Sequence, residues 1–240
     1  MANIEETLAD LTTLKITEAA YEKATRYAKF AFKQQKSECY GWLLTPSNGE
    51  DSVVRDVMFA DRQKASYVRV ETSDLGVVLS AEDAARRGYK FVGWWHSHAD
   101  FEPFQSGIDK NNTTGLINLI GLKNFRDAYE EKTLLDGEIE TVLKEGGLLL
   151  KEKSGSRSVL LKGDFGLQNG LSVRKANLIV EQRLSFCYSL TVNSKRYKPS
   201  AQVAVGFENG DYTNVRLIDA SVKILDDEDS LKGEVEKKLS

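Results

Sequence analysis

The sequence predicts an α+β protein, because helical and strand-like patterns both occur among its apolar residues. Residues 18–36 place alanine, tyrosine and phenylalanine at helical spacing, which is typical of an amphipathic helix. Residues 90–96, Lys-Phe-Val-Gly-Trp-Trp-His, are rich in β-branched and aromatic side chains and predict a short buried strand. With 240 residues, 41% hydrophobic and 29% charged, the chain can bury a sizeable core. We therefore expect helices packed on a sheet.

The first half of the chain alternates between these two patterns. Thr17 is the expected N-cap of the first helix. Ser80, with Asp83 three residues later, predicts the start of a short helix through Arg87, which Gly88 ends. Strands are expected between these helices, at 40–45, 53–60 and 67–71.

The second half begins with a predicted amphipathic helix at 124–145, stopped by a pair of glycines. Leucine-rich and valine-rich runs at 148–150 and 159–161 flank a Ser-Gly-Ser turn and predict a β-hairpin. Further strands are expected at 185–192, 201–207 and 215–225, and the acidic residues from 226 onward predict a solvated tail.

Composition narrows the classes of function. A net charge of −3 provides no basic footprint for nucleic acid. The two cysteines, Cys39 and Cys187, lie far apart in apolar segments, so we expect no disulfide and a reducing compartment. The N-terminal residues lack the pattern of a signal peptide, and no stretch has the roughly 20 apolar residues that span a bilayer. We expect a cytoplasmic protein without a membrane partner.

Both histidines of the chain lie at the end of the 90–96 strand, as His96 and His98. Side chains at i and i+2 of a strand share a face, so two imidazoles can converge there on a metal such as zinc. His-x-His alone is a weak pattern that often arises by accident. Ser106 is expected to cap a helix whose first turn carries Asp109, which supplies a third ligand and leaves a fourth position for water.

Other carboxylates compete with Asp109 for this role. Asp100 and Glu102 lie closer to the histidines in the sequence, although charges in a turn beside proline are more often solvated. A catalytic thiol is not favoured, because both histidines that could serve as its base are assigned to the metal. A zinc deaminase is not favoured either, because that class uses His-x-Glu with a later Pro-Cys-x-x-Cys.

The pattern His96-x-His98, seven residues, Ser106-x-x-Asp109 resembles the signature of the JAMM (MPN-plus) zinc metallopeptidases. That family also has an upstream Glu-x-x-Gly-x-Leu, which corresponds here to Glu38 through Leu43. The resemblance is to the prokaryotic and archaeal-type members. The residue after the second histidine is Ala99, where the family often has proline.

The resemblance implies an MPN/JAB1-like fold, a mixed sheet flanked by helices with cytidine-deaminase-like architecture. The zinc site would lie at a strand end and the following helix. It also suggests a catalytic domain at 14–225, with its core at 14–115 and 185–225, an insertion at about 116–184 and a charged tail at 226–240.

The resemblance further implies one zinc ion per chain, held by His96, His98 and Asp109, with Glu38 as general base and Ser106 steadying the water or the oxyanion. The expected reaction is hydrolysis of an isopeptide bond in conjugates of ubiquitin or a ubiquitin-like protein, and a regulatory protein partner is expected. Two alternatives stay open at this point. One is a non-catalytic MPN scaffold in a larger complex, and the other is a protease that trims a sulfur-carrier or viral precursor protein.

Overall fold

The computed structural model describes most of the chain. The described ranges are 2–48, 53–60, 63–65, 70–72, 74–121, 124–135, 139–144, 147–152, 158–162, 175–195, 197–207 and 215–226. The helices are α1 (Ile4–Leu11), α2 (Glu18–Gln35), α3 (Asp74–Arg86) and α4 (Gly107–Ile120). The strands are β1 (Ala2–Asn3), β2 (Thr13–Thr17), β3 (Tyr40–Pro46), β4 (Asp56–Phe59), β5 (Gln63–Ala65), β6 (Val70–Thr72), β7 (Tyr89–Ser97), β8 (Phe125–Leu135), β9 (Ile139–Lys144), β10 (Gly147–Glu152), β11 (Ser158–Lys162), β12 (Lys175–Val192), β13 (Ser200–Phe207) and β14 (Val215–Leu225).

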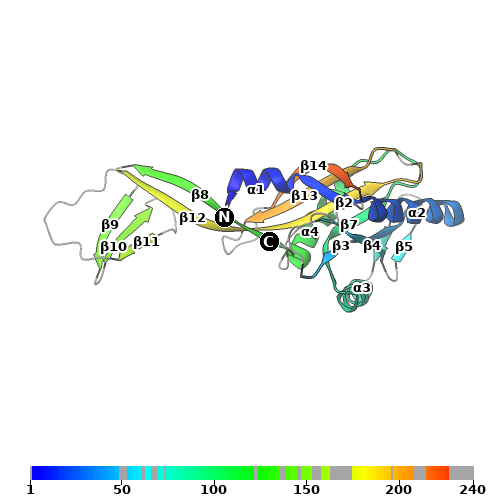
Figure 1. Cartoon of the computed structure of the whole chain (residues 1–240), viewed down its shortest axis with the longest axis horizontal. Coiled ribbons are helices and arrows are strands. Elements are labelled where there is room, and N and C mark those ends of the chain that lie inside the picture. Colours follow the sequence, from blue (N-terminus) through cyan, green and yellow to red (C-terminus); the bar gives the residue numbers. More distant parts are fainter. Residues whose placement is uncertain are drawn as a thin grey trace. The chain divides into compact units, whose positions relative to one another are not determined.

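A mixed β-sheet forms the centre of the fold, in the order β2-β14-β13-β12-β7-β3-β4 (Figure 1). β7 pairs parallel to β12 and antiparallel to β3, and β14 pairs parallel to β2. Gly93 permits the close approach of β7 to β12, because a Cβ at this position would collide with the Tyr188 backbone. The α+β prediction, with a mixed sheet flanked by helices, is confirmed.

Consecutive tryptophans on β7 show which helices cover each face of the sheet. The ring of Trp95 stacks on Tyr27 of α2, with centroids 5.9 Å apart. Trp94 points to the opposite face, where its indole N–H donates to Thr113 of α4 at 3.1 Å. Because side chains alternate along a strand, His96 lies on the Trp94 face and therefore on the side of α4.

The first helix forms as predicted. α2 begins after Thr17, whose side chain accepts a hydrogen bond from the backbone N–H of Ala20 at 3.3 Å. Its buried residues include three alanines at helical spacing, Ala20, Ala24 and Ala28. These small side chains allow the helix to lie close to the sheet.

Two sequence predictions about helices are wrong. The helix before β7 begins at Asp74, so Ser80 lies inside α3 rather than at its cap. The segment predicted as a helix at 124–145 forms β8 and β9 instead. β9 pairs antiparallel with β10, and β8 pairs with β12 and β1. Pairing with distant strands outweighs the local helical periodicity of this segment.

The remaining predicted strands are present. β10 and β11 form the expected antiparallel hairpin, with Leu149 opposite Leu160. The predicted strand at 53–60 appears as β4, and the strand expected from 185 is the end of the longer β12. Of the strand predicted at 67–71, residues 67–69 lie outside the described residues, and 70–71 belong to β6.

The chain divides into two compact units. One contains Met1–Ile4 and Ala128–Gln182, and the other contains Glu5–Asp127 and Arg183–Ser240. Helices α2, α3 and α4 and the strands in the order from β2 to β4 belong to the second unit, except for residues 175–182 of β12, which belong to the first. The predicted domain limits remain a prediction. Helix α4 continues past residue 116 to Ile120, and residues 227–240 of the predicted tail lie outside the described part.

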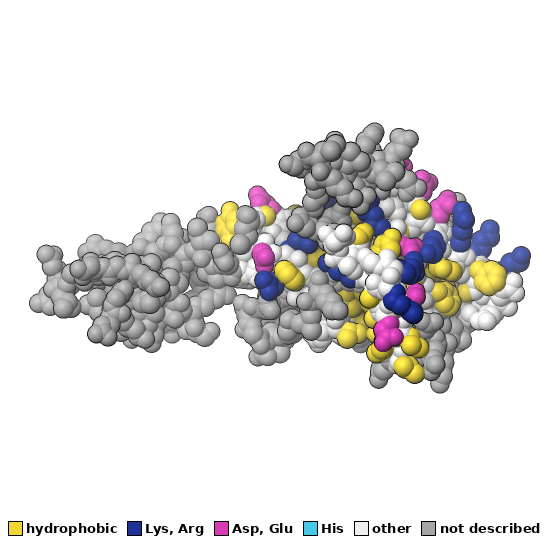
Figure 2. Space-filling model, turned by 60° about the horizontal axis from the view of Figure 1, so that its bottom comes forward, with side chains coloured by type: hydrophobic (Ala, Val, Ile, Leu, Met, Phe, Trp, Pro, Cys, Tyr) yellow, Lys and Arg dark blue, Asp and Glu magenta, His cyan; other side chains and the backbone are white. Residues whose placement is uncertain are grey.

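Ion pairs connect α2 and α3 to β4 in the second unit. Asp56 of β4 pairs with Lys23 of α2 at 2.6 Å and also with Arg87, just after α3. Arg86 pairs with Asp83 at 3.3 Å. Basic and acidic side chains are accordingly interspersed on the described part of the face drawn in Figure 2.

Cys39 and Cys187 are buried free thiols, as expected from their spacing. Burial raises the pKa of both to about 12. Among the described helices, none is both long enough and apolar enough to cross a membrane.

Candidate metal centre

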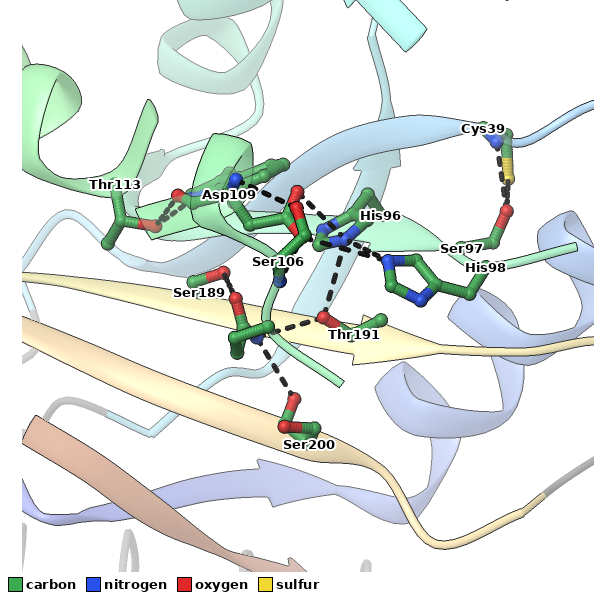
Figure 3. Close-up of polar contacts among 12 residues, drawn as sticks. Cys39, His96, Ser97, His98, Ser106, Asp109, Thr113, Ser189, Thr191 and Ser200 are labelled. Carbon is green, nitrogen blue, oxygen red and sulfur yellow. Dashed lines mark hydrogen bonds and ion pairs between the residues drawn. The ribbon is translucent and has the colours of Figure 1, made fainter. Parts of the chain in front are cut away.

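The two histidines converge at the carboxyl end of β7. His96 is the penultimate residue of the strand, and His98 follows it with its backbone N–H bonded to the carbonyl of Val192 at 3.0 Å. This bond continues the pairing with β12 past the end of β7, so His98 keeps the strand alternation. The two Nε2 atoms lie 3.1 Å apart, and both side chains are buried (Figure 3).

Asp109 reaches the same point from the first turn of α4. Ser106 is the N-cap of this helix, as predicted from the sequence, and it also forms a capping box with Asp109. The Ser106 backbone N–H donates to Asp109 Oδ2 at 2.8 Å, and the Asp109 N–H donates to Ser106 Oγ at 3.2 Å. Because the capping box uses Oδ2 of Asp109, the other carboxylate oxygen, Oδ1, faces His96 Nε2 at a distance of 3.2 Å.

The three side chains form a group with the dimensions of a metal site. Their ligand atoms all lie within 4.8 Å of one another. The Nε2 atoms lie 3.1 Å apart, His96 Nε2 is 3.2 Å from Asp109 Oδ1, and His98 Nε2 is 3.7 Å from Asp109 Oδ2. Ligands about 2.0–2.1 Å from a tetrahedral zinc ion lie about 3.3–3.4 Å from each other. The residues present therefore fit a tetrahedral ion with one position left over.

Glu38 lies beside this group, although its sequence neighbours resemble those of a surface charge. Tyr40 is opposite His96 in the antiparallel pair of β3 and β7, so Glu38, two residues earlier, comes opposite His98. Its side chain is largely buried, at 9% exposure, and lines the same cavity as the histidines and Asp109. The structure thus brings all five predicted site residues to one cavity.

Ser97 holds the segment that carries Glu38 beside the end of β7. Its side chain points away from the histidines, as strand alternation requires, and its Oγ accepts from the Cys39 backbone N–H at 2.9 Å. The Ser97 N–H in turn donates to the Cys39 carbonyl at 2.9 Å, and Figure 3 shows the Ser97 hydroxyl turned toward Cys39. These two bonds attach the segment before β3 to the end of β7.

Burial and neighbouring groups shift the pKa values at the site in different directions. Burial raises the pKa of Glu38 to about 7, with the nearby Asp109 charge adding to the rise and His98 opposing it. Burial also acts to raise the pKa of Asp109, but hydrogen bonds from His96, His98 and Ser106 outweigh it and hold that pKa well below its usual range. Burial lowers the pKa of His96, which favours the neutral imidazole that binds metals.

A cavity of about 520 Å³ opens on the cluster. Three apolar side chains at its edge are largely exposed, namely Phe101, Phe104 and Ile108. The edge of the Phe104 ring meets the His98 ring, with centroids 4.5 Å apart. Glu102 lines the cavity too, whereas Asp100 pairs with Lys195 at 3.3 Å. Neither belongs to the ligand cluster, which is made of His96, His98 and Asp109.

The loop after His98 departs from regular backbone geometry at Ala99. This buried residue has φ of 39°, in the left-handed region. Proline is restricted to φ near −65° and could not adopt this backbone angle. Asn193 fixes the loop by donating from Nδ2 to the Phe101 carbonyl at 2.8 Å.

Several residues that support the site escaped the sequence analysis. Trp94 stacks on the His96 ring with centroids 4.6 Å apart, and Thr191 Oγ1 lies 3.4 Å from His96 Nε2. Thr113 connects Trp94 to the Asp109 carbonyl, to which it donates at 2.7 Å. His96 Nδ1 is buried and has no hydrogen-bond partner among the described residues. Of these residues, only Trp94 lies in the segment that the sequence predicts to carry the histidines, the strand at 90–96.

Comparison with known families identifies the class of protein that this fold and cluster define. Residues 22–130 match the prokaryotic homologues of the JAB domain. The matched segment contains all five predicted site residues and supports membership of the JAB/MPN family.

Comparison with solved structures gives, among others, the solution structure of protein DSY2949 from Desulfitobacterium hafniense. It is 12% identical, with a TM-score of 0.44, and the match covers 89% of this chain and 94% of that chain. Comparison with curated proteins gives no significant match.

Proposed function

We propose that the protein is a zinc-dependent peptidase that hydrolyses an amide bond, with conjugates of ubiquitin or a ubiquitin-like protein as substrates. One observation carries this proposal. The His96, His98 and Asp109 cluster opens on the same cavity as a buried carboxylate, Glu38, and a helix-capping hydroxyl, Ser106. A ligand cluster without such a carboxylate would suit a purely structural metal equally well.

The zinc ion would be held by His96, His98 and Asp109, and when bound it supplies a polarised carbonyl and a water of lowered pKa. Glu38 accepts the proton of the attacking water and delivers it to the leaving amine. Its pKa of about 7 suits both steps, because the group exchanges a proton readily near neutral pH.

Ser106 has a second role beside its capping bond. Its Oγ already accepts from the Asp109 N–H, so its hydroxyl proton can be donated toward the cavity that it lines. A donor aimed at the developing oxyanion is commonly worth ~2.7–4 kcal/mol. Asp109 stays ionised throughout, because hydrogen bonds hold its pKa far below neutral.

The Glu38→Gln substitution tests the proposed base. The amide preserves the shape of the side chain but cannot accept a proton, so we expect one zinc per chain by elemental analysis and a loss of turnover of at least about 100-fold. Substrates would be isopeptide-linked conjugates of several ubiquitin-like proteins, with products identified by mass spectrometry. Glu82→Gln, which changes an exposed carboxylate of α3, is the matched control.

Other results would replace parts of the proposal. Unchanged turnover in Glu38→Gln would exclude this residue as the base. A zinc-loaded wild-type protein inert on all amide substrates would favour a non-catalytic scaffold. Cleavage of an unconjugated sulfur-carrier or viral precursor, with isopeptide conjugates left intact, would assign a processing protease instead.

A further inference from the structure

Gln105, the residue immediately before the helix cap, bonds to two strands of the central sheet. Its Nε2 donates to Thr191 Oγ1 of β12 at 2.9 Å and to the Ser200 carbonyl of β13 at 3.4 Å. Its Oε1 accepts from Ser189 Oγ of β12 at 3.0 Å. Figure 3 labels the three partners, Ser189, Thr191 and Ser200.

The chemistry of the partners fixes the orientation of the Gln105 amide. A backbone carbonyl can only accept, so the NH₂ end must face Ser200. The same NH₂ group has a second proton for Thr191, and the amide oxygen is left for the Ser189 hydroxyl. Ser189 and Thr191 are fully buried. A partly buried amide with three matched partners has one low-energy orientation.

This contact bears on the metal cluster because the three ligands come from two different elements. His96 and His98 belong to the end of β7, whereas Asp109 belongs to α4, so the cluster keeps its dimensions only if the helix start is fixed relative to the sheet. After Asp109, the Trp94–Thr113 bond provides that connection. On the N-terminal side of Asp109, the bonds of Gln105 connect the start of α4 to the sheet.

We propose that Gln105 is a positioning residue for the metal centre: it anchors the segment that carries Ser106 and Asp109 to β12 and β13, and so sets the distance between Asp109 and the two histidines. The inference rests on the proposed metal site. Gln105 contacts neither the ligand atoms nor the substrate cavity, and it acts through Ser106, Thr191 and the start of α4.

The Gln105→Leu and Gln105→Glu substitutions in the full chain test this role by zinc affinity, measured in competition with a chelator. Leucine removes all three bonds. Glutamate keeps the shape but turns an acceptor toward the Ser200 carbonyl. We expect zinc affinity to fall about tenfold, the lower end of the effect of residues that orient metal ligands. Circular dichroism and thermal unfolding establish that each variant is folded.

Gln202→Leu separates positioning from general stabilisation of the sheet. Gln202 lies opposite Ser189 in the pairing of β12 with β13, and its Nε2 donates to Asp219 at 2.7 Å. This variant loses a part-buried hydrogen bond that connects β13 to the neighbouring β14. We expect reduced thermal stability with unchanged zinc affinity.

Ser189→Ala gives a second, milder test, because Ser189 touches Gln105 but no ligand. If Ser189 acts through Gln105, the double variant Ser189→Ala/Gln105→Leu binds zinc as tightly as Gln105→Leu alone. Zinc affinity within about twofold of wild type in folded Gln105 variants would overturn the positioning role while leaving the metal site standing. Absence of zinc binding by the wild-type protein would overturn both.

Discussion

Glu38 is an acidic side chain placed where burial works against its charge. Only 9% of the residue is exposed, and the neighbouring Asp109 carboxylate adds to the cost of ionising it. Both effects raise its pKa, to about 7. A carboxyl group in this state holds a proton at mildly acidic pH and releases it near neutrality.

The pH dependence of hydrolysis follows from this shift. Because only ionised Glu38 can accept a proton, kcat/KM should rise with pH, and the midpoint of the rise should lie at or below about pH 7. A bound cation favours the ionised form and moves the midpoint downward. The profile is measured on zinc-loaded protein under steady-state conditions. A rising limb centred above pH 8 would contradict the assignment of Glu38 as base.

Ala99 provides a test of the loop that follows the second ligand. Proline cannot adopt its φ of 39°, so Ala99→Pro should reduce the free energy of unfolding by ~3 kcal/mol or more and weaken zinc binding through the adjacent His98. Ala99→Gly, which tolerates this φ, should stay within ~1 kcal/mol of wild type. Urea denaturation measures both. Equal stability of the two variants would show that the backbone angle is not the constraint.

The pairing of β3 with β7 is the contact between elements on which the catalytic arrangement depends. It brings the residue before Cys39 to the level of His98, and Ser97 secures it with one side-chain and one backbone bond. The same alternation that directs His96 and His98 into the cavity directs Ser97 to the Cys39 backbone. One strand end therefore positions both the proposed metal ligands and the proposed base.

Ser97→Ala tests that connection. The substitution leaves the buried Cys39 N–H without its acceptor, which should cost ~1–3 kcal/mol of stability. We expect zinc to stay bound but turnover to fall, because Glu38 loses its anchor. Ser37→Ala is the matched control, since the buried Ser37 hydroxyl has no hydrogen-bond partner among the described residues. A loss of zinc equal to the loss of turnover would mean that Ser97 supports the ligands rather than the base.

Considering the chain as a whole, all the predicted site residues belong to the unit of Glu5–Asp127 and Arg183–Ser240. The proposed ligands come from α4 and the end of β7, and the proposed base precedes β3. A metal that binds only the folded arrangement stabilises all these elements together. Binding of the proposed metal should therefore be coupled to folding of this unit.

Zinc should accordingly raise the unfolding temperature. At a free concentration 100-fold above its Kd, a ligand of the native state adds ~2.7 kcal/mol. In a chain of this size that corresponds to about 5–10 °C. Differential scanning calorimetry of chelator-treated and zinc-loaded protein measures the shift, and His96→Ala should abolish it. An equal zinc-induced shift in His96→Ala would place the metal elsewhere.

Local sequence patterns were sufficient to predict that His96 and His98 share a face and that Ser106 caps the helix carrying Asp109. His96 and His98 share a face because strand alternation has a period of two, and Ser106 with Asp109 forms a capping box because helix starts use that spacing. The first helix with its Thr17 cap and the 148–161 hairpin follow from equally short-range rules. Each of these features is decided by residues a few positions apart.

Tertiary structure alone decided the remaining features. Glu38 looks like a surface charge until the register of β3 on β7 buries it, and only its resemblance to a known motif identified it earlier. No local pattern predicts the hydrogen bond between Gln105 and Thr191, because these two residues are 86 positions apart in the chain. The segment at 124–145 has helical periodicity, but residues 125–135 and 139–144 form strands, because hydrogen bonds to β10 and β12 outweigh this periodicity. Pairing between distant residues leaves no pattern within a short window of sequence. For this physical reason, features decided by nearby residues could be predicted from the sequence, and features decided by distant residues could not.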